Sequence, residues 1–161
     1  MMTILSDLST KSSSVNFAFS FEDGDFSLDD GGKINFATGI NKLVQDIDRC
    51  LKTHYNPDTD EGNRVYDTLQ ILDQYSEGSI LGLIESDFRD ALIRLKANQY
   101  TNSLPDERIR SIERVKAEYY NGDFTTVMVH MIILNGLNQS VPVSSLLDAQ
   151  NLTIRHLYYE V

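Results

Sequence analysis

Near the start of the chain, apolar and polar residues alternate over Val15–Phe21. A period of two residues is typical of a β-strand, because successive side chains of a strand point to opposite faces of a sheet. Further along, segments 25–28 and 33–36 flank an Asp-Asp-Gly-Gly sequence. Glycine adopts positive φ without steric cost and aspartate tolerates turn geometry, so we predict a hairpin around residues 29–32.

Two longer segments carry apolar residues at helical spacing. The first begins near Thr38, a candidate N-cap, and the second covers residues 79–99. In both, apolar side chains recur at intervals of three and four residues, which places them on one stripe of an α-helix. The predicted stripes are Ile40, Leu43, Val44, Ile47 and Leu51 in the first helix, and Leu81, Ile84, Phe88, Leu92 and Leu95 in the second.

The charged residues of both helices are assigned to the solvent side. On the first helix, this assignment covers Asp46, Asp48 and Lys52. On the second, Glu85 and Arg89 are spaced i, i+4 and are predicted to form an ion pair worth about 0.2–0.5 kcal/mol. Between the helices, residues 55–63 read as a polar loop, and residues 65–75 give no clear pattern.

The C-terminal half is predicted to consist mainly of strands. It opens with a short helix near residues 104–109, because Pro105 stands at a first helical position and two acidic residues follow it. Asn-Gly pairs then mark hairpin turns between apolar segments. The predicted strands are 115–119, 124–134 and 139–143, and the turns are 121–122 and 135–136.

Three features suggest how this sheet is bordered. Residues 124–134 become apolar on both faces, which indicates a central strand. Pro142 has no amide donor and is therefore predicted at an edge or a bulge. The segment 152–161 is expected to form an extra strand or an arm, and it ends near the aromatic pair Tyr158 and Tyr159.

The predicted fold class is α+β: two main amphipathic helices packed on a small, mostly antiparallel β-sheet, with an N-terminal hairpin. A length of 161 residues fits one domain with a real core. The predicted organisation is a flexible N-terminal arm at 1–14, a single α+β domain at 15–149, and a C-terminal strand or arm at 150–161.

Composition narrows the functional classes. The formal net charge of -10 argues against broad binding to nucleic acid or anionic membrane, both of which require Lys/Arg patches. The first residues lack a basic start and a long apolar stretch, so no signal peptide is predicted and synthesis in the cytoplasm is expected. A single cysteine, Cys50, excludes a disulfide within the chain.

No catalytic residue is predicted. The chain has no G-x-S-x-G elbow, P-loop or G-x-G-x-x-G sequence. His130 lies among apolar residues and is interpreted as structural, and Cys50 at the margin of a helical stripe is interpreted as a buried, inert thiol. A carboxylate pair acting on a glycoside remains an alternative, because acidic residues are frequent.

No metal ion or other cofactor is predicted either. Asp58 and Asp60 fit two ligand positions of an EF-hand loop that begins at Asn56. However, Glu61 occupies the position of the required glycine, and position twelve lacks a glutamate. Zinc would need more Cys and His ligands than the chain has. The acidic cluster near residues 22–30 has no calcium-site template and is interpreted as a solvated turn.

The order of elements carries a further signal. A hairpin with the pattern D-F-S-x-D-x-x-G-x-I precedes a helix, a loop, a second helix, a turn with an acid and an arginine, and a β-meander. This order, over roughly residues 20–145, resembles the baseplate wedge or sheath-initiator family of contractile phage tails and related injection systems. The family's Glu-Pro-Arg triplet corresponds here to Asp106-Glu107-Arg108, with Pro105 one residue earlier. The other matching positions are Asp25, Phe26, Ser27, Asp29, Gly32, Ile34, Ile40, Val44, Ile47, Leu51, Thr53, Ala91, Leu92, Ile109 and Val115.

The resemblance implies a structural role in a virion, with no enzymatic activity. Six copies would surround the tail tube and hub, bind baseplate wedge proteins on one side, and hold the first ring of tail sheath protein on the other. An exposed sheet edge would accept an extended arm of the sheath protein by β-augmentation. Arg108 would contact a carboxylate, and the acidic turn would face a basic neighbour. The implied partner-binding residues are Asp29, Asp30, Asp106, Glu107, Arg108, Pro142, Tyr158 and Tyr159.

Two other readings remain open. The first is an acidic protein-binding module, or an inhibitor that mimics nucleic acid, with a basic partner; the net charge favours it. The second is a hydrolase with a carboxylate pair, which predicts a cleft that contains a carboxyl group of raised pKa.

Overall fold

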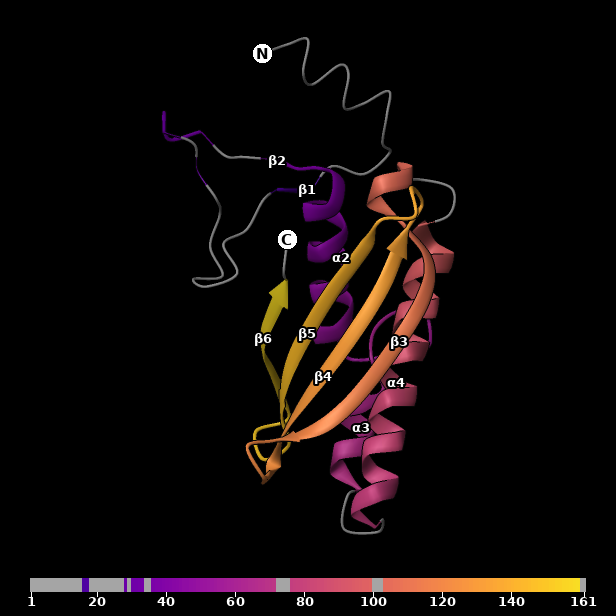
Figure 1. The fold of residues 1–161 in the computed structure, drawn as a ribbon, viewed down its shortest axis with the longest axis vertical. Helices are drawn as coiled ribbons and strands as arrows, with labels where there is room; N and C mark the ends of the chain where they lie inside the picture. The colour runs from indigo at the N-terminus through magenta and orange to yellow at the C-terminus, as the bar shows by residue number, and fades with distance from the viewer. Residues whose placement is uncertain are drawn as a thin grey trace.

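The computed structural model describes residues 16–17, 28, 30–33, 36–71, 76–99 and 103–159, of which 16–17, 77 and 155–159 are described by their backbone alone. It confirms the α+β fold class: helices cover one face of a four-stranded antiparallel sheet (Figure 1). The helices are α2 (Gly39–Lys52), α3 (Val65–Gln70), α4 (Glu77–Gln99) and the 3-10 helix η2 (Pro105–Glu107). The strands are β1 (Asn16–Phe17), β2 (Phe36–Ala37), β3 (Ile109–Tyr120), β4 (Asp123–Asn135), β5 (Ser140–Asp148) and β6 (Thr153–Tyr159).

The large sheet is a meander in the order β3-β4-β5-β6. β4 pairs with β3 on one side and β5 on the other, so the predicted central strand is confirmed. Asn121 and Gly122 connect β3 to β4 with φ angles of 51° and 72°, which is the geometry that a tight hairpin turn requires. The C-terminal segment 153–159 is a strand of this sheet, paired with β5.

The N-terminal sheet is small. β1 pairs antiparallel with β2, with Phe17 opposite Phe36. β1 lies in the strand predicted at 15–21. Its partner β2 contains Phe36, which the sequence assigns to a hairpin with segment 25–28. Residues 25–27 and 29 lie outside the described residues, so the structure does not test the predicted pairing of segment 25–28.

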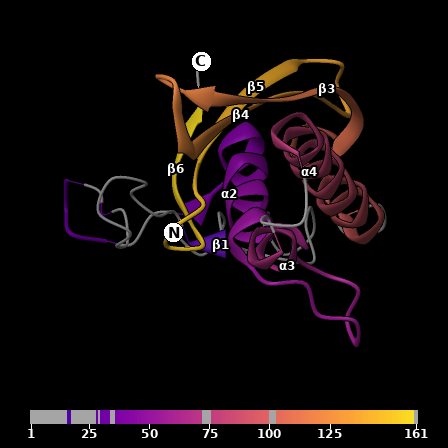
Figure 2. The ribbon, with the colours of Figure 1, turned by 90° about the horizontal axis from the view of Figure 1, so that it is seen from below.

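The core lies between the inner face of the large sheet and the two long helices, and Figure 2 shows α2 and α4 side by side under this face. Both predicted stripes are confirmed at their centres, while Ile40, Leu81 and Leu95 are only partly buried. Full burial of an aliphatic or aromatic side chain contributes about 1.5–3 kcal/mol. The residues with 1% exposure or less include Leu43, Val44, Ile47, Leu51, Ile84, Phe88, Ala91, Leu92, Val127, Val129, Met131 and Ile133.

The turn after β4 packs directly against η2. Gly136 N–H donates to the carbonyl oxygens of Pro105, at 2.7 Å, and Arg108, at 3.2 Å. A Cβ atom on Gly136 would lie 2.5 Å from the Pro105 carbonyl oxygen. The close approach of the two backbones therefore requires glycine at position 136. The predicted short helix is confirmed, with Pro105 in its first turn.

Two sequence predictions about strands and helix charges are wrong. Pro142 lies in β5, an interior strand, opposite Ile132 of β4. The described pairing of β5 with β6 begins one residue later, at Val143, so the proline stands where that ladder ends. On α2, the sequence assigns Asp46 to the solvent side, but Asp46 is only 6% exposed and the neighbouring Lys42 is 2% exposed.

Candidate protein-interaction site

The resemblance directs attention to the two outer strands of the sheet, β3 and β6. α4 runs alongside β3 (Figure 2). Three of its side chains form hydrogen bonds with the backbone of that strand. Glu85 Oε1 accepts a hydrogen bond from Ala117 N–H at 3.0 Å. Arg89 Nη1 donates to the Ile112 carbonyl oxygen at 3.3 Å. The predicted Glu85–Arg89 ion pair is therefore wrong, because both side chains bind β3.

Gln99, at the end of α4, closes the start of the same edge. Its Oε1 accepts from Ile109 N–H at 3.0 Å, and its Nε2 donates to the Glu107 carbonyl oxygen at 3.2 Å. The side chain is 5% exposed, so these bonds are shielded from water. Three α4 side chains thus occupy backbone groups along β3 that an added strand would need.

β6 forms the other border. Within the part of the chain that the structure describes, no strand pairs with β6 on the side away from β5. The ladder shifts register between the pairs Leu146–His156 and Leu147–Ile154, which leaves Arg155 as an extra, bulged residue. A bulge and a basic residue on an outer strand both discourage unspecific pairing. By backbone register, Tyr158 lies opposite Ser144 and Tyr159 opposite Val143.

The Asp106-Glu107-Arg108 triplet lies at an internal junction. Glu107 is 2% exposed, and its Oε1 accepts from Gly39 N–H at 3.2 Å, at the start of α2. A carboxylate at this position satisfies a free amide and opposes the positive end of the helix dipole. Glu107 is therefore not available to a partner, which corrects its predicted role.

The other predicted contact residues differ in accessibility. Asp106 is partly buried, with Oδ2 3.1 Å from the place that a Cβ atom on Gly39 would occupy. Arg108 is partly buried, and its side chain forms no ion pair with the described residues. Asp30 is exposed in a turn, and Asp29 lies outside the described residues.

A buried ion cluster, which the sequence reasoning missed, joins α2 to η2. Lys42 Nζ lies 3.1 Å from Asp46 Oδ2 and 3.9 Å from Glu107 Oε2. Only the first contact is a hydrogen bond, and Glu107 Oε2 has no hydrogen-bond partner among the described residues. One buried ammonium group therefore compensates two buried carboxylates. The sequence signal was the i, i+4 spacing of Lys42 and Asp46, which also suits an exposed pair.

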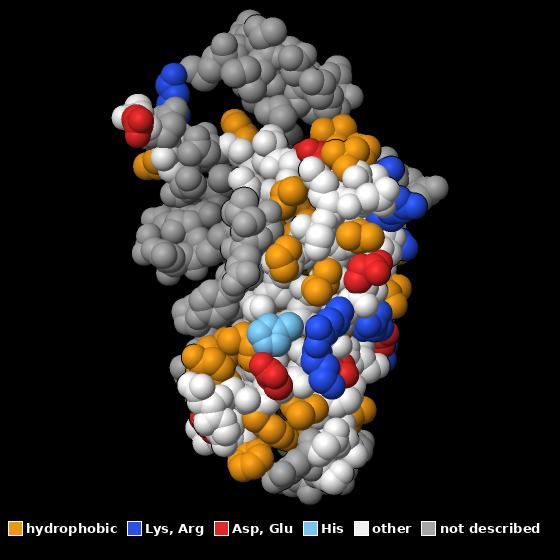
Figure 3. Space-filling model, viewed as in Figure 1, with side chains coloured by type: hydrophobic (Ala, Val, Ile, Leu, Met, Phe, Trp, Pro, Cys, Tyr) orange, Lys and Arg blue, Asp and Glu red, His pale blue; other side chains and the backbone are white. Residues whose placement is uncertain are grey.

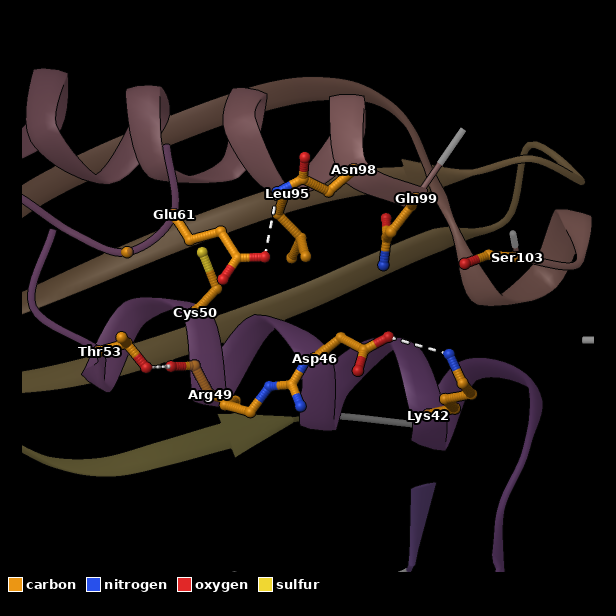
Figure 4. A pocket seen from close by; sticks show the side chains of 11 residues that line it. Lys42, Asp46, Arg49, Cys50, Thr53, Glu61, Leu95, Asn98, Gln99 and Ser103 are labelled. Atoms are coloured by element: carbon orange, nitrogen blue, oxygen red, sulfur yellow. Dashed lines mark hydrogen bonds and ion pairs between the residues drawn. The ribbon is translucent and has the colours of Figure 1, made fainter. Parts of the chain in front are cut away.

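A pocket of about 520 Å³ lies between α2, the end of α4 and the 53–63 loop (Figure 4). Asp46 and Glu61 both line this pocket, so it is the candidate site for the carboxylate pair of the hydrolase alternative. Asp46 is engaged by Lys42, and Glu61 accepts a long hydrogen bond from Asn98 at 3.5 Å. Burial raises the pKa of the Asp87 carboxyl, but that group accepts a hydrogen bond from Thr68 and does not line the pocket.

Cys50 also lines this pocket, and burial raises the pKa of its thiol to about 11. At neutral pH the group is a thiol, which is a poor nucleophile, in agreement with the inert cysteine predicted. Its Sγ contacts the Ala91 carbonyl oxygen at 3.5 Å. Asp46, Glu61 and Cys50 therefore each bind another described residue at this pocket.

No protein-family model matches the chain, and no curated protein or solved structure has significant similarity to it. In the described ranges, no helix is both long and apolar enough to cross a bilayer. The same residues contain no group of three or more His, Cys, Asp or Glu side chains arranged to hold a metal ion.

Proposed function

We propose that this chain is a structural component of a contractile-tail baseplate that starts sheath assembly. Its β6 edge would accept an extended segment of the tail sheath protein by β-augmentation. The observation that supports this proposal is the difference between the two sheet borders. α4 closes β3 with Glu85, Arg89 and Gln99, whereas no described strand covers β6.

In this mechanism, backbone hydrogen bonds supply affinity and alternate side chains fix the register. The bulge at Arg155 interrupts the outer edge of β6, so an incoming strand would pair mainly with the segment after it, 156–159. A short pairing segment favours a partner whose arm is already held nearby, as in a ring of sheath subunits. Tyr158 and Tyr159 lie in this segment.

The remaining parts of the proposal come from the resemblance. Baseplate wedge proteins would bind on the side opposite the sheath, six copies would surround the tube and hub, and the acidic turn that contains Asp29 and Asp30 would face a basic neighbour. Arg108 is the basic member of the triplet and forms no ion pair with the described residues, so it is the candidate for a wedge carboxylate. The chain would be made in the host cytoplasm and end in the virion.

The test is sheath nucleation observed by electron microscopy. Tail sheath protein from the same virion is mixed with a substoichiometric amount of the folded chain. We expect more numerous and shorter sheath polymers, each with the chain at one end. Unchanged polymer number and length, with a chain shown to be folded by circular dichroism, would reject the proposal. Binding to a basic enzyme without any effect on sheath protein would favour the acidic-module alternative.

A further inference from the structure

The outer face of the large sheet, opposite the helices, carries apolar residues although no other layer of the described fold covers it. Successive strand residues alternate between faces, so the outer positions are those between the buried ones. Figure 3 shows hydrophobic side chains running down the middle of this face, with basic residues along one side. The outer apolar positions of β4 and β5 are Met128, Ile132, Leu134, Pro142 and Leu146, all partly buried.

The strand register arranges this face in three cross-strand rows. The upper row is Arg114–Ile132–Pro142, the middle row is Lys116–His130–Ser144, and the lower row is Glu118–Met128–Leu146. Each row therefore runs across β3, β4 and β5 in that order. The upper row has a basic residue on β3 and the lower row an acidic one, and both have apolar residues on β4 and β5.

This arrangement is self-complementary. A two-fold axis along the middle row, parallel to the sheet surface, places the upper row of one copy over the lower row of another. Arg114 then faces Glu118 of the second copy, and Ile132 faces Met128 of the second copy. Pro142 similarly faces Leu146. Identical patches that match in this way are the requirement for an isologous dimer.

Arg114 and Glu118 do not pair with each other within one chain. Residues four apart on a strand are separated by about 13–14 Å, so Arg114 cannot reach Glu118 of its own strand. The Arg114 side chain forms no ion pair with any described residue. Glu118 binds His130 through one oxygen at 3.0 Å, and its side chain remains 63% exposed.

The middle row fits the position of the axis. Its Lys116 ammonium is held at the β3 edge by Glu85 at 3.2 Å, away from the centre of the face. His130 was predicted to be structural, and its ring binds Ser144 and Glu118 on this outer surface rather than within the core. Ser144 and the His130 ring therefore lie nearest the centre of the face, and the Lys116 ammonium lies at its edge.

We propose that two copies of this chain pack these outer faces together as a two-fold β-sandwich. Paired sheets of this kind lie about 10 Å apart, with side chains of both faces interlocking. The inference concerns the free protein and does not depend on the proposed baseplate function, because it uses only strand register, exposure and charge. A second copy fits because the two-fold rotation places the row that contains Glu118 in one copy opposite the row that contains Arg114 in the other.

The test is sedimentation equilibrium of the full chain over a wide concentration range. Ile132→Glu puts a charge in the centre of the face and is expected to weaken dimerisation at least about a hundredfold. Ile93→Glu is the matched control, because Ile93 is 49% exposed on α4. Arg114→Glu and Glu118→Arg are each expected to weaken the dimer about tenfold, since each reversal affects two symmetric pairs. The double variant should return to within about threefold of the wild-type dissociation constant.

A wild-type chain that stays monomeric at every concentration would overturn the inference. A dimer that tolerates Ile132→Glu as well as Ile93→Glu would show that another surface mediates association. Single charge reversals that the double variant fails to rescue would refute the two-fold pairing of Arg114 with Glu118. Circular dichroism of each variant confirms that it remains folded.

Discussion

Replacement of Lys42 by methionine tests the buried ion cluster most sharply. The substitution keeps most of the apolar stem of the side chain but removes the ammonium group that contacts Asp46 and Glu107. The two contacts, at 3.1 and 3.9 Å, correspond to Coulomb attractions of about 5 and 4 kcal/mol at an effective dielectric constant of about 20. Most of this attraction offsets the cost of removing the charges from water, so it is not the net loss.

The expected destabilisation is about 3–5 kcal/mol, the typical cost of leaving a buried charge without its partner.

The assay is urea unfolding at pH 7, followed by circular dichroism. Lys52→Met is the matched control on the same helix, because Lys52 lies 2.8 Å from Asp48 with a side chain 38% exposed. Its expected cost is below about 0.5 kcal/mol. Addition of Asp46→Leu to Lys42→Met should recover about 2 kcal/mol, since apolar groups replace a buried pair well. If Lys42→Met costs no more than Lys52→Met, the reasoning about the cluster is wrong.

Three further predictions follow from the same structure. Gly136→Ala should destabilise the chain by about 1–3 kcal/mol, because the added methyl group overpacks against Pro105. Gly82→Ala has open space around it on α4 and should stabilise the chain by about 0.5–1 kcal/mol. Urea unfolding measures both, and equal effects of the two variants would contradict this prediction. Glu85→Ala should speed hydrogen exchange of the Ala117 amide, measured by NMR, while a Lys96→Ala control on α4 leaves it unchanged; an unaltered Ala117 rate would argue against the edge cap. Burial raises the pKa of Cys50 to about 11 and of Tyr66 to about 12, so the folded state retains both protons and the free energy of unfolding should fall as the pH rises above about 9. A Cys50→Ala variant should lose the part of this pH dependence that lies below pH 11. If the variant and the wild type lose stability identically at alkaline pH, the thiol is not buried as described.

The sequence predicts the regular parts of this fold well, because those parts depend on local periodicity. Leu43, Val44 and Ile47 lie on the stripe that their spacing indicates, and the Asn121-Gly122 turn adopts the positive φ angles that its residues favour. The start of β3 was missed, since register shifts near Ile109–Ser111 and Ile112–Arg114 break the alternation. The end of β5 was missed too, because Ser145 is fully buried although its residue type suggests exposure.

The candidate sites depended on tertiary contacts and were harder to predict. Pro142 was assigned to an edge because it lacks an amide donor. The missing donor affects only one position of the ladder, so a proline can stand in an interior strand where the pairing with β6 ends. Lys42 and Asp46 have the spacing of a solvent-exposed pair, and their burial beside Glu107 of η2 depends on tertiary packing. The hydrogen bonds from α4 to β3 could not be predicted from the sequence, because the spacing of Glu85 and Arg89 equally favours an ion pair between them.

The most direct test of the central claim is residue-resolved amide hydrogen exchange of the chain, alone and with tail sheath protein. The account predicts that Ile109 and Ala117 exchange slowly in the free chain, because Gln99 and Glu85 bind their amides. It also predicts that amides in 156–159 become protected only when sheath protein is present. Protection that appears along β3, or rates in 156–159 that sheath protein does not change, would contradict the claim that β6 is the edge that receives a partner strand.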